Sequence, residues 1–298
     1  MTEKEHKACL GYNEACTKDF RNILGDIAYA AEAGFEEIEL RFDCIESFLQ
    51  AGGSLELLGQ SLKEHGLRQG PVNALYLYPG LFTEDDGKEE HAEFHARLNL
   101  LREMHASIGT SQVIAVAPLL KNRREAAVFS KHEAFDMCVT ALKRLCLDLP
   151  EICFIFEPVG LERSLVRDAD FAKEIIDAVA CENIGLVLDS CNLFLKNLSS
   201  DFDFSALNAA DIKAVHLMNG IMPDLSREIL DQSWRRFLDD GDAVDTDLFL
   251  QRLAELSYVG MISTEVFNEE YERNLSQQQI IERAAVSLKQ ALKKNAWR

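Results

Sequence analysis

The chain has 298 residues, of which 47% are hydrophobic and 27% charged, a balance typical of a globular protein with a sizeable core. Its formal net charge of −19 disfavours binding to nucleic acid or to an anionic membrane surface. The first ten residues, MTEKEHKACL, lack the apolar segment of a secretory signal, and no apolar run approaches the roughly 18 residues of a membrane span. The eight cysteines include no CxxC pair. We therefore expect a reduced, cytoplasmic protein without nucleic-acid or membrane partners.

Short apolar runs alternate with longer amphipathic stretches along the whole chain. Consecutive apolar residues in most of these runs are typical of strands buried on both faces of a parallel sheet. Eight strands are predicted, at residues 8–13, 36–41, 70–76, 111–118, 152–158, 184–190, 212–218 and 260–266. Amphipathic stretches with helical spacing lie between them, for example at 22–35, 89–109, 168–179 and 246–260.

Eight successive strand-then-helix units favour a single (β/α)8 barrel over a doubly wound sheet with a second domain. The length agrees, because such barrels commonly need about 250 residues. No Pro-rich or Gly/Ser-rich linker interrupts the alternation, so one domain spanning residues 1–298 is predicted. Two longer connections, 78–91 and 219–245, follow the third and seventh strands and are expected at the carboxyl face of the barrel.

Four predicted strands carry a side chain that could bind a metal at or near their carboxyl ends. These are Glu157 in FIFEPVG, Asp189 in IGLVLDS, His216 in IKAVHLMN and Glu265 in MISTEVFN. A single acid at a strand end is more often a turn-initiating residue, and a lone histidine in an apolar strand is more often a satisfied core residue. The repetition on four successive strands favours a shared site.

In a barrel, the carboxyl ends of parallel strands meet at one rim, so these four side chains would converge. Three carboxylates at close range repel one another unless a cation neutralises them. One imidazole with three carboxylates suits Mn²⁺, Zn²⁺, Co²⁺ or Mg²⁺. The sequence therefore predicts one divalent metal ion at the barrel mouth.

The chain resembles the xylose isomerase-like TIM barrel family of sugar isomerases and epimerases over nearly its whole length, and within it the inosose (2-keto-myo-inositol) isomerases. The resemblance is carried by YNEACT, GFEEIELR, PVNAL, VIAVAP, FEPVG, NIGLVLDS, VHLMNG and STEVFN, in that order. It implies that the Glu-Asp-His-Glu set binds one divalent metal. It also implies a small-molecule sugar or inosose substrate and a possible homo-oligomer.

The resemblance further implies a metal-dependent isomerase or epimerase that works by proton transfer. One glutamate, Glu157 or Glu265, would remove the proton on the carbon beside the ketone and leave a cis-enediolate. The other would return a proton to the opposite face or to the neighbouring atom. Asp189 and His216 would hold the metal.

Three further residues are candidates for substrate binding. Asn192 stands in DSCN where the family usually has a histidine, and an amide can hydrogen-bond but cannot shuttle a proton. Arg236 in RFLDDGD stands in for the arginine that precedes a Gly-rich loop in the family, although the proline and one glycine are missing. Asn73 lies near the end of the third strand. These departures leave the substrate less defined than the metal site.

Other functions remain open at this point. An inosose dehydratase-like lyase would use the same enolate chemistry and then expel a hydroxyl group. A sugar-binding protein that has lost catalysis would keep the fold, although it would not need three mutually repelling carboxylates. A DNA-repair enzyme like endonuclease IV shares the barrel but needs many metal-binding histidines. Only His216 lies at a predicted strand end here, and the net charge is −19.

Overall fold

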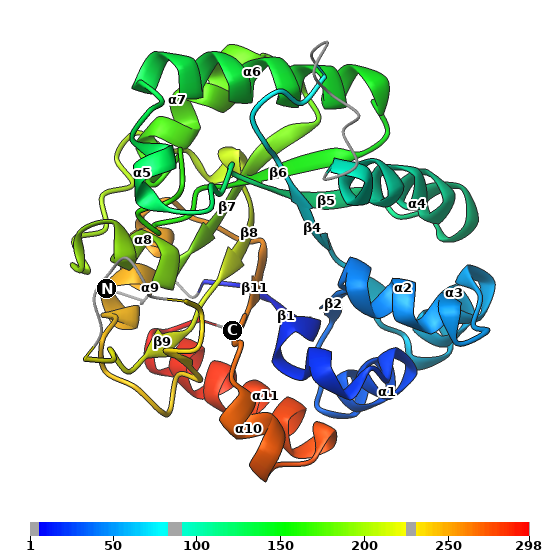
Figure 1. Ribbon diagram of the computed structural model, residues 1–298. Helices are drawn as coiled ribbons and strands as arrows, with labels where there is room; N and C mark the ends of the chain where they lie inside the picture. The colour runs from blue at the N-terminus through cyan, green and yellow to red at the C-terminus, as the bar shows by residue number, and fades with distance from the viewer. Residues whose placement is uncertain (1–5, 83–90, 225–230, 298) are drawn as a thin grey trace.

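The computed structural model describes residues 6–82, 91–224 and 231–297. Within them, nine parallel strands form one sheet in the order β3-β2-β1-β11-β8-β7-β6-β5-β4, with helices around it (Figure 1). The strands are β1 (Cys9–Asn13), β2 (Glu37–Glu39), β3 (Arg68–Gln69), β4 (Val72–Tyr76), β5 (Gln112–Val116), β6 (Cys153–Glu157), β7 (Ile184–Asp189), β8 (Ile212–His216) and β11 (Met261–Ser263). Eight of them overlap the eight predicted strands, and β3 precedes the predicted third strand at 70–76.

The third strand of the barrel is interrupted by Gly70 and Pro71. Proline has no N–H for a ladder hydrogen bond, so the strand divides there. The piece before it, β3, pairs with β2, and the piece after it, β4, pairs with β5. The ring is completed by a bridge between Arg41 and Asn73, whose backbone N donates to Leu40 O at 2.8 Å. The predicted (β/α)8 barrel fold is confirmed.

The central strands are apolar on both faces, as expected of a parallel sheet covered by helices outside and filled with side chains inside. Ile114 of β5, Ile155 of β6 and Val187 of β7 have no solvent exposure. Most buried polar side chains of the strands lie at the carboxyl ends, for example Glu39, Asp189 and His216. The barrel interior is therefore a packed core that ends in a polar layer at the mouth.

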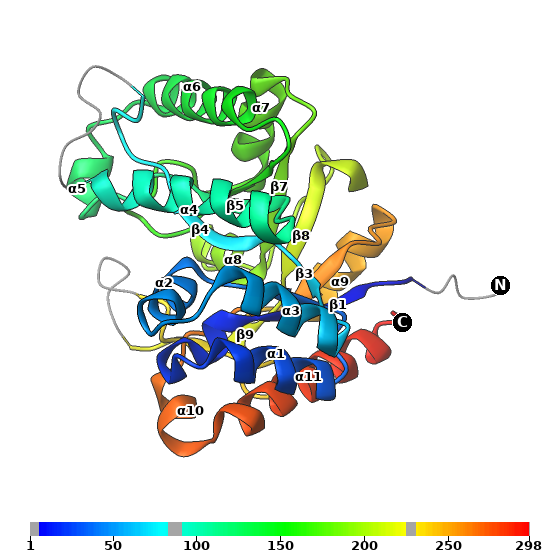
Figure 2. The same ribbon diagram turned by 90° about the vertical axis from the view of Figure 1, so that its right-hand side faces the viewer.

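Eleven α-helices and two 3₁₀-helices are present in the described residues. They are η1 (Glu14–Phe20), α1 (Ile23–Glu32), α2 (Phe42–Gln50), α3 (Leu55–His65), α4 (Ala92–Ile108), α5 (Arg123–Ala126), α6 (Lys131–Asp148), α7 (Ala169–Val179), α8 (Ser190–Asn197), η3 (Ala209–Asp211), α9 (Thr246–Glu255), α10 (Glu269–Asn274) and α11 (Gln277–Lys294). Capping boxes at Ser130 and Ser276 begin the two longest, α6 and α11. The last helix, α11, packs against α1 (Figure 2). None of the described helices is long and apolar enough to cross a membrane.

The two long connections predicted at the carboxyl face are described only in part, because residues 83–90 and 225–230 lie outside the described residues. The second connection contains a short antiparallel pair, β9 (Asn219–Gly220) and β10 (Arg235–Arg236). Gly220 allows this pair to form, since a Cβ there would lie 2.1 Å from the ring of Trp234. The pair brings an arginine into the mouth of the barrel.

Candidate metal centre

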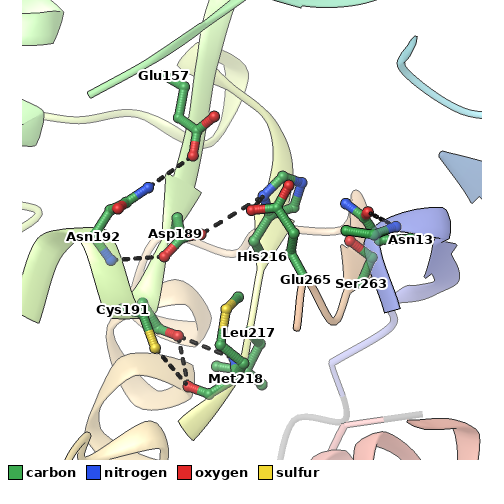
Figure 3. A network of polar contacts seen from close by, with 12 residues as sticks. Asn13, Glu157, Asp189, Cys191, Asn192, His216, Leu217, Met218, Ser263 and Glu265 are labelled. Atoms are coloured by element: carbon green, nitrogen blue, oxygen red, sulfur yellow. Dashed lines mark hydrogen bonds and ion pairs between the residues drawn. The ribbon is translucent and has the colours of Figure 1, made fainter. Parts of the chain in front are cut away.

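Four buried side chains from neighbouring strands meet at the barrel mouth (Figure 3). Glu157, Asp189 and His216 are the last residues of β6, β7 and β8, and Glu265 follows β11 by two residues. Strand register aligns them, because Asp189 pairs with His216, which in turn pairs with Ser263. These four residues, called the ligand cluster below, are those that the sequence predicted as metal ligands.

The ligand cluster offers one nitrogen and three oxygen ligand atoms that all lie within 4.8 Å of one another. His216 Nδ1 is 3.8 Å from Asp189 Oδ2 and 3.7 Å from Glu265 Oε2. An ion bound tetrahedrally at about 2.1 Å keeps its ligand atoms about 3.4 Å apart. The separations are therefore close to those that a single divalent cation requires.

Glu39, the last residue of β2, fixes the orientation of the His216 ring. His216 Nε2 lies 2.9 Å from Glu39 Oε2, and Ser263 Oγ donates to the other oxygen of the same carboxylate. Glu39 and His216 have no solvent exposure. With Nε2 occupied in this way, Nδ1 is left buried, without a hydrogen-bond partner, and faces the carboxylates. This is the arrangement that carboxylate–histidine–metal sites use.

Arg235 of β10 supplies a fixed positive charge to the cluster. It is fully buried, and its Nη1 lies 2.9 Å from Asp189 Oδ2 and 2.8 Å from Glu265 Oε2. The guanidinium lies 5.7 Å from the centre of the Phe267 ring. Because arginine stays protonated in proteins, it offsets part of the charge of three close carboxylates.

The two glutamates have pKa values that are displaced in opposite directions. Burial and the nearby Glu265 carboxylate raise the pKa of Glu157 to about 8. Burial also acts on Glu265, but the positive charges of His216 and Arg235 outweigh it and lower its pKa. Burial opposes protonation of His216, yet Glu39 and Glu265 outweigh it and raise that pKa to about 10. A cation bound by these groups would displace protons from them.

The residues present fit one divalent cation. The donor atoms are hard oxygens and one imidazole nitrogen, the set preferred by Mn²⁺, Zn²⁺, Co²⁺ or Mg²⁺. His216 Nδ1 is buried and has no hydrogen-bond partner in the described structure. Buried polar atoms are rarely left without a partner, so a ligand at this nitrogen is expected. The centre could therefore hold one divalent metal ion.

Of the three predicted substrate-binding residues, two contact the ligand cluster and one does not. Asn192 of α8 lies in the centre, where its Nδ2 donates to Glu157 Oε1 at 2.8 Å and its Oδ1 is buried without a partner. Asn73 of β4 donates to Glu265 Oε1 at 2.6 Å. Arg236 lies outside the ligand cluster, because its Nη1 donates to the carbonyls of Ser233 and Arg235. The neighbouring Arg235, which the sequence did not single out, contacts the ligand cluster.

Two residues of the centre, Glu39 and Arg235, are absent from the sequence-based prediction. In EEIELR a single apolar residue precedes Glu39, so it lacks the apolar run that revealed the other acids. Arg235 gives no such signal, because which of two adjacent arginines faces inward depends on the pairing of Arg235 with Gly220.

Known proteins resemble the chain in sequence and in fold. An inosose isomerase of Bacillus velezensis is 26% identical over 267 residues, which cover 88% of this chain and 89% of that protein. An inosose isomerase of Halalkalibacterium halodurans is 26% identical over 274 residues, with 88% and 89% covered. A solved structure described as IOLI protein with a binding zinc atom superposes with a TM-score of 0.83 at 24% identity, covering 96% of this chain and 98% of that one.

The model of one protein family matches nearly the whole chain. The match spans residues 27–291, from α1 to within α11, and so includes every member of the ligand cluster. The chain therefore belongs to the xylose isomerase-like TIM barrel family.

Proposed function

We propose that the protein is a divalent-metal-dependent isomerase or epimerase of a keto-sugar or inosose. The observation that carries the proposal is the meeting of two buried glutamates, Glu157 and Glu265, with Asp189 and His216 in one cluster that fits a divalent cation. Two carboxylates in one centre give one group to remove a carbon-bound proton and another to return a proton. The inosose isomerases at 26% identity support the substrate class.

The ligand cluster would hold the cation through His216 Nδ1 and one oxygen of each carboxylate. When bound, the cation supplies electrophilic polarisation of the ketone and hydroxyl oxygens, which makes the carbon-bound proton between them more acidic. The zinc atom named for the IOLI structure supports zinc as one suitable ion.

Glu265 and Glu157 would divide the proton transfers. Glu265, kept ionised by His216 and Arg235, accepts the carbon-bound proton and leaves a cis-enediolate. Glu157, which Asn192 orients through a hydrogen bond to Oε1, returns a proton. Return to the opposite face gives an epimer, and return to the neighbouring atom gives an isomer.

The side chains around the glutamates would orient the substrate and the reacting groups. Asn192 Oδ1, buried and unpartnered, is placed to accept a hydrogen bond from a substrate hydroxyl. Arg235 takes the substrate-binding role that the sequence suggested for Arg236. Asn73 donates to Glu265 and so orients that carboxylate. Cytoplasmic location and homo-oligomeric assembly stay predictions from the sequence.

The proposal is tested by incubating protein loaded with Mn²⁺ or Zn²⁺ with 2-keto-myo-inositol and a panel of ketoses. We expect a product of the same mass as the substrate, identified by mass spectrometry and NMR. A product that is lighter by one water would instead identify a dehydratase. Unchanged substrate across the panel, with the metal bound, would contradict the proposed function.

A further inference from the structure

Buried polar atoms without hydrogen-bond partners gather at the barrel mouth. Such atoms are rare in folded proteins, because each costs the free energy of its lost hydration, and they often mark where a ligand binds. Those in the described residues include Asn13 Nδ2, Glu14 Oε1, Asp189 Oδ2, Asn192 Oδ1, His216 Nδ1 and Arg235 Nη2, of which Asp189 Oδ2 has an ion pair with Arg235 Nη1. A cation in the ligand cluster would use those of Asp189 and His216. The donor on Asn13 has no such use.

Asn13 lies in the same layer of the barrel as the ligand cluster. It is the last residue of β1 and pairs with Glu39, and it has no solvent exposure. Side chains alternate along a strand, and a Cβ on Gly11, two residues earlier, would contact Met261 and Ser263 inside the barrel. Asn13 therefore also points inward, and Figure 3 shows it on the same side as Ser263.

The amide of Asn13 can present only its nitrogen to the mouth. Its Oδ1 accepts a hydrogen bond from Ala15 N at 2.9 Å and so caps η1. Because a backbone N–H must be accepted by oxygen, that bond distinguishes Oδ1 from Nδ2. The nitrogen is therefore left as an uncharged donor without a partner. The matching ligand group is an uncharged oxygen acceptor, such as a hydroxyl or carbonyl oxygen.

We propose that Asn13 is a substrate-binding residue whose Nδ2 donates a hydrogen bond to an oxygen of the keto-sugar or inosose. The proposal rests on the proposed function and adds a contact from β1, across the barrel from Glu157. Together with Arg235 Nη2 and Asn192 Oδ1 it gives two donors and one acceptor around the ligand cluster. A polyhydroxy ketone, whose hydroxyl groups both donate and accept, complements this pattern.

The variants Asn13→Ser and Asn13→Ala separate substrate binding from helix capping. Serine keeps a capping oxygen but lacks the amide donor, whereas alanine loses both. We expect both variants to lower kcat/KM for 2-keto-myo-inositol by roughly five- to hundredfold, the range for losing one hydrogen bond to a bound group. Only Asn13→Ala should also lower Tm, and neither variant should change the metal content.

Asn122→Ser is the matched control, because Asn122 caps the short helix α5 in the same way at an exposed position. It should leave kcat/KM unchanged. If wild-type protein converts the ketone and Asn13→Ser does so with the same kcat/KM, Asn13 only caps η1 and the inference is wrong while the proposed function stands. If metal-loaded wild-type protein leaves the ketone unchanged, both the proposed function and the inference are wrong.

Discussion

Glu39 shows how a residue without direct contact to the metal can decide its binding. Its carboxylate joins three strands, because it meets His216 of β8 and Ser263 of β11 from β2. The hydrogen bond to Nε2 keeps Nδ1 directed at the carboxylates. Partners of this kind typically change metal affinity by 10- to 100-fold when they are removed.

Replacing Glu39 therefore tests the assembly of the centre. We expect Glu39→Leu to weaken Mn²⁺ or Zn²⁺ binding by about 10- to 100-fold, since the ring loses its acceptor. Glu39→Gln should weaken it less, because an amide oxygen still accepts from Nε2. Competition with a chelator measures both affinities, and circular dichroism checks folding. Wild-type affinity in a folded Glu39→Leu variant would contradict the role given to Glu39.

At the residue scale, the sequence predicted which side chains meet in the ligand cluster better than it predicted what surrounds them. Glu157, Asp189 and His216 each end an apolar run, and a barrel converts that linear pattern into proximity. The choice between Arg235 and Arg236 depends on a pairing between β9 and β10 in which adjacent side chains point to opposite sides. That pairing involves residues far apart in a loop, so local sequence does not reveal it.

At the scale of single elements, the existence of strands was predictable and their ends were less so. The stretch 260–266 forms a strand only over Met261–Ser263, so Glu265 lies beyond it. The predicted third strand, 70–76, forms only over Val72–Tyr76, and Arg68–Gln69, outside that range, pairs with β2. Hydrophobic periodicity reports burial, whereas strand ends depend on hydrogen bonds to neighbours.

Asp189 both caps helix α8 and belongs to the ligand cluster, and substitutions can separate these two roles. Its Oδ1 accepts from Asn192 N at 2.7 Å and caps α8, while its Oδ2 belongs to the ligand cluster. Asp189→Asn keeps a good capping residue but loses the charge, whereas Asp189→Ala loses both. We expect both to weaken metal binding, and only Asp189→Ala to lose the capping contribution of about 1 kcal/mol.

Thermal unfolding of the metal-free variants and titration with Mn²⁺ or Zn²⁺ measure the two effects separately. Equal metal affinity in wild type and Asp189→Asn would remove Asp189 from the ligand set. Equal Tm values for the two variants would show that the cap contributes little to α8.

At the scale of the whole molecule, a buried polar network joins the first and last helices. Asp26 of α1 accepts hydrogen bonds from Thr17 Oγ1 at 2.6 Å and from Gln277 Nε2 of α11 at 2.8 Å. Gln277 lies 251 positions from Asp26 in the chain, so local sequence patterns do not reveal this contact. The prediction that residues 1–298 form a single domain stays a prediction.

This network should make stability depend on pH. Burial raises the pKa of Asp26 to about 7, although hydrogen bonds from Thr17 and Gln277 act against it. Because the folded pKa exceeds the unfolded value of about 3.9, the contribution to stability is complete below about pH 4 and is lost as pH rises through 7. Asp26→Asn should remove that part of the decline, on the order of 1 kcal/mol or more between pH 5 and 8.

Denaturant unfolding at several pH values checks this, with wild type and Asp26→Asn compared under identical metal conditions. The buried carboxyl of Glu14 interacts with Asp26, and burial raises its pKa as well. The variant Glu14→Gln therefore serves as the second measurement. An unchanged pH profile in both variants would show that these acids do not take up protons on folding.

The proposed chemistry is tested most directly by following deuterium from solvent into the substrate. Metal-loaded wild-type protein in D₂O should place deuterium on the carbon that is isomerised or epimerised. Glu157→Gln keeps an amide oxygen for the cation but cannot transfer the proton, so exchange should slow by about 10²- to 10⁴-fold, and Glu265→Gln should behave alike. Conversion by wild type without deuterium in the product would indicate hydride transfer or a fully shielded proton. Exchange at the wild-type rate in both variants would make the glutamates ligands only, and would contradict the proton transfers assigned to them.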